Sequence, residues 1–158
     1  MKRILFLAIV AAAILLGCTV SAMASERTDY SRGKGALVRI GAGAPANAEF
    51  GFGYQLNPHC SLAAEAYSFW GLTTFTGALD ARYYFMDQAF TPFVGAKAGY
   101  GLLGKTMSYR DCYDFMGAAL AGLSWRGLDL GAGVIYDPFH GAQFTASLNW
   151  NIRIGGRR

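Results

Sequence analysis

The sequence is poor in charged residues. Aspartate, glutamate, lysine and arginine make up 15% of its 158 residues, against roughly 25% in a typical soluble domain. A soluble protein with so little charge would have difficulty staying dispersed in water. A barrel that spans a membrane faces lipid with its outer wall and needs few charges there. The composition therefore favours a membrane barrel over a soluble domain.

The sequence also lacks clusters of residues that would carry a metal site or bind nucleic acid. Its two histidines do not combine with cysteine at a metal-ligand spacing, because His59-Cys60 is one adjacent pair without a second pair. Apart from Arg157 and Arg158, the basic residues are scattered, whereas a nucleic-acid interface needs a basic patch. We expect no metal, no cofactor and no nucleic-acid partner.

A long, strongly apolar run without charge lies at the N-terminus. Ile4–Gly17 holds 14 residues without a charge and would span about 21 Å as a helix, short of the ~30 Å hydrocarbon layer. Lys2-Arg3 precedes the run and Ala22-Met23-Ala24 follows it, a pattern typical of a secretory signal over residues 1–24. A membrane anchor is one alternative. Lipidation at Cys18, within Leu15–Cys18, is another.

Few cysteines and few cations remain once the signal is removed. Without Lys2 and Arg3, 12 basic and 10 acidic residues are left, and the formal net charge falls from +4 to +2. Cleavage after Ala24 would leave Cys60 and Cys112. The strand arrangement below places these two at opposite ends of the fold, beyond the ~7 Å Cα separation that a disulfide allows. We expect no intramolecular disulfide.

What the sequence does contain is alternation of apolar and polar residues with a period of two. Phe144–Ile154 is the clearest example, with apolar residues at every even position and mostly polar ones between them. Weaker versions recur along the chain. The eight expected strands are Gly35–Ala44, Glu49–Leu56, Ser61–Phe69, Phe75–Phe85, Thr91–Leu102, Phe115–Trp125, Leu128–Asp137 and Phe144–Ile154.

These strands predict an all-β fold, an eight-stranded antiparallel up-and-down transmembrane β-barrel over residues 35–154. Residues 25–34 would form an N-terminal periplasmic segment, and residues 155–158 a basic C-terminal tail. The alternative is a soluble β-sandwich, whose oily face would lie in a core between two sheets. Aromatic residues gather near both ends of the expected strands, as in the girdles of membrane barrels.

Short turns and longer connections alternate along the chain. Asn57-Pro58, Met86–Gln88 and Arg126-Gly127 are short and fall at every second connection, as periplasmic turns do in membrane barrels. Of the intervening connections, only Leu103–Asp114 is long. It would form an outer loop, and its contact candidates are Lys105, Tyr109, Arg110 and Asp111.

The polar face of the expected strands points into the barrel. An eight-stranded barrel leaves an interior just wide enough for its own side chains, so buried charges there must pair. We interpret the set as a packed polar network; an ion pathway or a proton relay is the alternative. Its members are Arg39, Glu65, Asp80, Arg82, Lys97, Asp129 and Arg153, lined further by Glu49, Gln55, Asn149 and Asn151.

Three segments read as periplasmic hairpins of a known kind: Gly53–Pro58, Ala81–Phe85 with Thr91–Gly95, and Leu128–Gly133. In these the chain resembles the small outer-membrane barrels of the OmpA-like and opacity-protein type. The resemblance implies a place in the cell outer membrane. It also implies contact with outer-membrane lipids and lipopolysaccharide, and insertion by the barrel-assembly machinery. Members of the family usually end on an aromatic residue, whereas this chain continues past Ile154.

The expected function is structural or envelope-interacting, not enzymatic. The alternatives are a surface adhesin or host-contact protein, a lipid A-modifying enzyme and a small ion-conducting pore. The enzyme would need a nucleophile beside a base. His140 has Asp137 and Ser147 nearby in the sequence, but the spacing does not match that of the deacylase barrels. The sequence pattern does not indicate whether the protein is a monomer or an oligomer.

Overall fold

The computed structural model of the chain describes residues 32–44, 46–69, 74–105, 111–138 and 141–154. The expected signal sequence, the alternative lipidation at Cys18, the basic tail and His140 lie outside these residues. Within the described part of the chain, no helix is long and apolar enough to cross a membrane.

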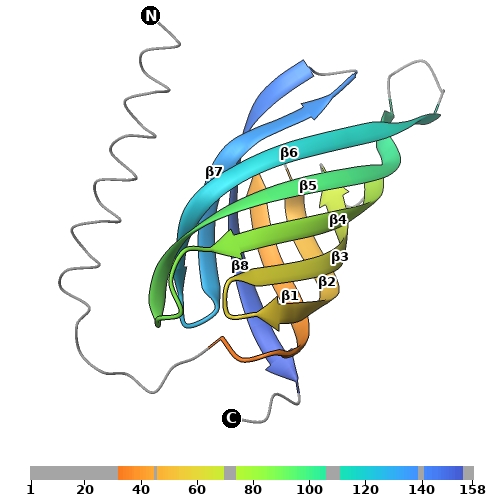
Figure 1. Cartoon of the computed structure of the whole chain (residues 1–158). Helices are drawn as coiled ribbons and strands as arrows, with labels where there is room; N and C mark the ends of the chain where they lie inside the picture. The colour runs from red at the N-terminus through yellow and green to blue at the C-terminus, as the bar shows by residue number, and fades with distance from the viewer. Residues whose placement is uncertain (1–31, 45, 70–73, 106–110, 139–140, 155–158) are drawn as a thin grey trace, which may run out of the picture.

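Eight antiparallel strands close into one barrel, in which each strand pairs with the next and β8 pairs with β1 (Figure 1). The fold class predicted from the sequence is confirmed, and each expected strand overlaps an observed one. The sandwich alternative is wrong, because a single sheet closes on itself. The strands are β1 (Gly35–Ala44), β2 (Ala46–Asn57), β3 (Cys60–Phe69), β4 (Thr74–Tyr84), β5 (Phe90–Lys105), β6 (Asp111–Trp125), β7 (Leu128–Asp137) and β8 (Gly141–Ile154).

The two ends of the barrel differ. The end that carries the β2–β3, β4–β5 and β6–β7 turns, together with the start of β1 and the end of β8, is called the turn end; the opposite end is the loop end. At the turn end, β6 and β7 are joined by Arg126 and Gly127 with φ of 50° and 92°, as a tight two-residue hairpin requires. Cys60 begins β3 at the turn end, whereas Cys112 belongs to β6 at the loop end.

The expected long loop Leu103–Asp114 is wrong. β5 and β6 continue as a paired hairpin, with Leu102 opposite Tyr113 and Lys105 opposite Asp111 across a bulge. The connection shrinks to residues 106–110, which the structure does not describe. Polar side chains in this stretch suggested a loop, but a ladder is held by its backbone groups and continues through polar residues as long as these groups pair.

The wall separates apolar from charged side chains. Phe115, Phe144 and Leu130 point outward with 70%, 71% and 60% of their surface exposed, while Arg39 and Asp80 point inward with none exposed. Most outward aromatics gather in two belts, whereas Phe52 lies near the middle of β2. Tyr54, Tyr83, Phe85 and Trp125 lie toward the turn end, and Tyr100, Phe115, Tyr136 and Phe144 toward the loop end.

The interior is filled at two levels. An apolar cluster of Tyr67, Ala78, Met116 and Ile135 occupies it toward the loop end, with Ala118 packed against it. Charged and polar side chains fill much of the rest, down to the turn end, together with the buried side chains of Leu37, Ala63, Tyr84, Phe93 and Leu120. This second level holds the candidate site.

Close packing of neighbouring strands leaves no room for a side chain at Gly133, whereas Gly77 has room for one. A Cβ on Gly133 would lie 1.9 Å from the carbonyl oxygen of Ala119, whereas a Cβ on Gly77 would meet nothing within 4 Å. We expect Gly133→Ala to lower the free energy of unfolding by about 1–3 kcal/mol, because the backbone must shift. Gly77→Ala should leave it unchanged or slightly higher. Urea unfolding in detergent micelles, followed by tryptophan fluorescence, measures both; equal midpoints would contradict the argument.

Candidate functional site: the polar interior

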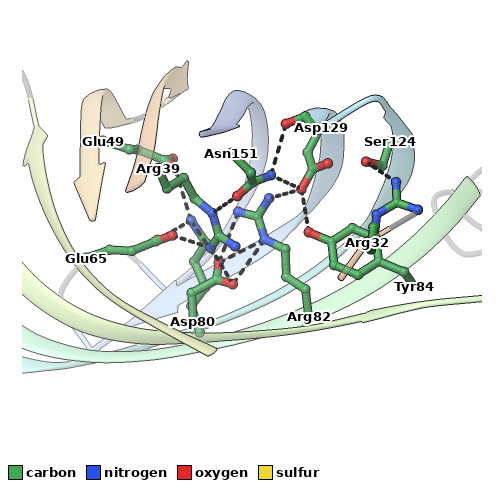
Figure 2. A network of polar contacts seen from close by, with 12 residues as sticks. Arg32, Arg39, Glu49, Glu65, Asp80, Arg82, Tyr84, Ser124, Asp129 and Asn151 are labelled. Atoms are coloured by element: carbon green, nitrogen blue, oxygen red, sulfur yellow. Dashed lines mark hydrogen bonds and ion pairs between the residues drawn. The ribbon is translucent and has the colours of Figure 1, made fainter. Parts of the chain in front are cut away.

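The interior of the barrel brings together charged side chains from six strands. Because side chains alternate across the wall, every second residue of each strand points inward. The resulting set is called the lumen network (Figure 2). Its members are Arg39 of β1, Glu49 of β2, Glu65 of β3, Asp80 and Arg82 of β4, Lys97 of β5 and Asp129 of β7, all buried.

Asp80 is the centre of this network. Its Oδ1 lies 2.8 Å from Nη1 of Arg39 and 3.0 Å from Nε of Arg82. Its Oδ2 accepts a hydrogen bond of 3.1 Å from Nη2 of Arg82 and lies 3.4 Å from Nζ of Lys97. Arg82 follows Asp80 by two residues on the same face, and Lys97 stands opposite Asp80 in the β4–β5 register. Arg39 reaches the same carboxylate from β1, so the contact crosses the barrel.

Lys97 and Arg39 connect Asp80 to two glutamates, Glu49 and Glu65. Nζ of Lys97 lies 3.0 Å from Oε2 of Glu49 and 3.0 Å from Oε2 of Glu65. Arg39 forms an ion pair with Glu65 through Nη1. The ammonium of Lys97 also lies 4.8 Å from the centre of the Tyr67 ring, a cation–π contact that joins the charged level to the apolar cluster.

Asp129 closes the network into a ring. Its Oδ2 accepts hydrogen bonds from Nη1 of Arg82 at 2.7 Å, from the hydroxyl of Tyr84 at 2.9 Å and from Nδ2 of Asn151 at 2.8 Å. Oδ1 of Asn151 in turn accepts a 2.7 Å hydrogen bond from Nε of Arg39. Arg39, Asp80, Arg82, Asp129 and Asn151 thus form a closed circuit of contacts, which ties β1, β4, β7 and β8 together across the lumen.

The residues singled out from the sequence divide into two groups in the structure. Arg39, Glu65, Asp80, Arg82, Lys97 and Asp129 are brought into contact as described. Arg153 is only partly buried, on the inward side of β8 near the turn end and outside the ring. Of the outer candidates, Lys105 and Asp111 are register partners in the β5–β6 hairpin. Tyr109 and Arg110 lie outside the described residues.

One buried cation was missed by the sequence analysis. Arg32 precedes β1 and was assigned to the N-terminal periplasmic segment over residues 25–34, yet only 2% of its surface is exposed. Its guanidinium lies inside the turn end, 4.6 Å from the centre of the Tyr84 ring. Strand periodicity could not have found it, because Arg32 belongs to no strand.

Each carboxylate of the network lies within ion-pair distance of an arginine or a lysine. In the part of the chain that the structure describes, no group of three or more histidine, cysteine or acidic residues is arranged to hold a metal ion. His59 lies in the β2–β3 turn, with Nδ1 2.9 Å from the carbonyl oxygen of Tyr84. This arrangement suits a rigid interior, since networks of buried polar groups rigidify when their members are paired.

Removing the central negative charge should be costly. Asp80→Asn preserves the shape of the side chain but leaves Arg39, Arg82 and Lys97 facing a neutral amide. We expect the free energy of unfolding to fall by about 3–5 kcal/mol, as when one partner of a buried ion pair is lost. Arg126→Asn removes a charge at an exposed turn position where asparagine tolerates the positive φ, and it should stay within about 0.5 kcal/mol of the wild type. Urea midpoints that move equally for both variants would refute the central role of Asp80.

Comparison with known proteins supports the fold. No protein-family model matches the chain, and no curated protein sequence matches it. Among solved structures, it is similar to the N-terminal β-barrel domain of Pseudomonas aeruginosa OprF, with a TM-score of 0.52 and 18% sequence identity. The match covers 77% of this chain and 98% of that domain. The chain therefore has the same barrel fold as the N-terminal domain of OprF.

Proposed function

We propose that the chain is an outer-membrane β-barrel protein with a structural or envelope-interaction role and an interior that does not conduct. The observation that carries this proposal is the inverted distribution of its side chains. Large apolar residues cover the outside of the closed wall, and the buried charges lie inside it. A protein surrounded by water would place these two sets the other way round.

The geometry of the wall fits a bilayer. Only helices and closed barrels satisfy all backbone polar groups without water, and this sheet is closed. The strands hold 10 to 16 residues, enough for the ~9–11 residues that a tilted membrane strand needs. The two belts of outward aromatics match the girdles at the two membrane surfaces. Their separation by an apolar zone supports a transmembrane orientation.

The position of the short turns supports one direction of insertion. In outer-membrane barrels the tight turns face the periplasm and the longer connections face outward. The turn end is then periplasmic, which agrees with export by the expected signal over residues 1–24. The partners proposed on this basis are outer-membrane lipids, lipopolysaccharide and the barrel-assembly machinery.

The filled interior argues against conduction. The ring around Asp80 and the cluster of Tyr67, Ala78, Met116 and Ile135 occupy successive levels of the lumen. A proton relay through the network would have to pass Arg82 or Arg39, and the guanidinium group of arginine does not give up its proton in proteins. The same contacts that hold the interior together therefore interrupt a path for protons.

Two alternatives remain testable beside the structural role. A host-contact protein would use the β5–β6 hairpin, the longest pair of strands, as its binding element. A lipid A-modifying enzyme would use His140. We propose a non-enzymatic role, so His140→Ala and deletion of the gene should both leave the lipid A mass spectrum of the cell unchanged. A new or missing lipid A species in either strain would favour the enzyme.

Fractionation tests the location directly. We expect the mature chain in the outer-membrane fraction, and we expect its mobility on SDS gels to change with boiling. Closed barrels resist cold detergent because their backbone groups are paired within the wall. Recovery of the chain in the soluble periplasmic extract, without a heat-dependent shift, would reject the membrane assignment.

A conductance measurement tests the closed interior. Wild-type protein that shows the heat-dependent shift should produce no current steps when reconstituted in a planar lipid bilayer at neutral pH. Reproducible steps from such folded protein would support the pore alternative and would show that the lumen network opens.

A further inference from the structure

A short segment before β1 crosses the turn end of the barrel. Arg32–Lys34, called the strap, leads into β1, which pairs with β2 and β8. The contacts of Arg32 lie instead in the β4–β5 turn and in β6, on the far side of the barrel. In Figure 1 this orange segment runs beneath the barrel at the turn end. The strap therefore joins walls that the strand ladder does not pair.

The guanidinium of Arg32 is held by groups that belong to other elements. Nη1 donates to the carbonyl oxygens of Met86 at 3.2 Å and Gln88 at 2.8 Å. Nη2 donates to Oγ of Ser124 at 2.9 Å (Figure 2). The Tyr84 ring covers one face at 4.6 Å. Planar stacking combined with several in-plane acceptors matches the recognition properties of a guanidinium, which a lysine ammonium does not reproduce.

The acceptors are fixed by contacts of their own. The backbone N–H of Met86 donates to Oγ1 of Thr91 at 2.8 Å, and that of Phe85 donates to the carbonyl oxygen of Pro92 at 3.1 Å. Tyr84 is oriented by its hydroxyl, which donates to Asp129. These bonds stand without Arg32. The pocket is thus part of the barrel wall, and the strap only fills it.

Charge gives the strap a second role. The lumen network contains four carboxylates (Glu49, Glu65, Asp80 and Asp129) and three cations (Arg39, Arg82 and Lys97), so it has one negative charge in excess. Arg32 adds a fourth cation, which stacks on the ring of Tyr84, while the hydroxyl of the same ring donates to Asp129. Because uncompensated buried charge is strongly unfavourable, this position stabilises both the network and the closed strap.

We infer that the turn end of the barrel contains a guanidinium-binding site, and that the strap closes the barrel by placing Arg32 in it. The ligand class of the site is a guanidinium group, which the chain supplies from its own N-terminal segment. Loss of the Arg32 side chain leaves a pocket of matching shape and charge that a free guanidinium ion can enter. The site is a property of the barrel and does not depend on its location in a membrane.

Chemical rescue tests the site. In purified full-length mature protein in detergent micelles, Arg32→Ala should lower the thermal unfolding midpoint. Millimolar guanidinium chloride should raise this midpoint again with saturation, whereas sodium chloride at equal concentration should not. The wild type, whose site is filled, should not respond. Arg126→Asn removes an exposed arginine at a position where asparagine tolerates the positive φ; it should behave as the wild type. Arg32→Lys should recover only part of the loss.

A second measurement reports closure rather than stability. Ser61 is buried near the start of β3, at the turn end, so Ser61→Cys, made with Cys60→Ser and Cys112→Ser, places a thiol inside the turn end without touching the groups that hold Arg32. We expect a water-soluble maleimide to label it at least about tenfold faster when Arg32→Ala is added, a factor that corresponds to about 1.4 kcal/mol of closure. Guanidinium should slow the labelling again.

Each outcome decides the inference. Unchanged midpoint and labelling in Arg32→Ala, or a response to sodium equal to that to guanidinium, would overturn it. If Arg32→Ala does not fold, refolding is repeated with guanidinium present. Recovery of the heat-dependent gel shift only with guanidinium supports the site, and failure in both conditions rejects it. A wild-type barrel found outside the membrane would refute the proposed function and leave this result intact.

Discussion

Asp80 carries the constraint on which the interior depends. An eight-stranded barrel has room inside for little more than its own side chains, so a charge that points inward must find its partner there. Asp80 contacts Arg39, Arg82 and Lys97, which come from three strands. Because β1 and β4 are not neighbours in the sheet, backbone pairing does not connect them, and this side-chain contact does. The ladder holds each strand to its neighbours, whereas this carboxylate holds opposite walls to each other.

The same constraint explains the small residues that line the wall. A long side chain in a narrow lumen needs space on a neighbouring strand, and glycine provides it. Asn149 is fully buried, and its Oδ1 would lie 1.8 Å from a Cβ on Gly41. The amide thus occupies the volume that a side chain on β1 would take. At Gly41, therefore, glycine leaves room for an inward polar side chain, whereas at Gly133 it leaves room for the neighbouring backbone.

Periodicity in the sequence predicted the fold and most of the site, since it determines which side of the wall a residue faces. That was sufficient for Asp80 and Arg82, because inward charges in a narrow lumen must meet. It could not distinguish Arg153 from members of the ring. Arg153 also points inward from β8, but it lies near the turn end, outside the ring. Nor could periodicity detect Arg32, whose position depends on a turn 54 residues further along the chain. Contacts across the lumen leave no local pattern in the sequence.

The closed circuit of Arg39, Asp80, Arg82, Asp129 and Asn151 also bears on whether the interior can open. Each member contacts two others, so moving one side chain breaks at least two contacts and leaves both neighbours short of a partner. Partly satisfied buried networks are unfavourable in a medium of low dielectric constant, which makes stepwise opening costly. Arg32 of the strap adds a further buried cation at the turn end. A lumen built this way favours one rigid closed state, which fits the proposed structural role better than conduction.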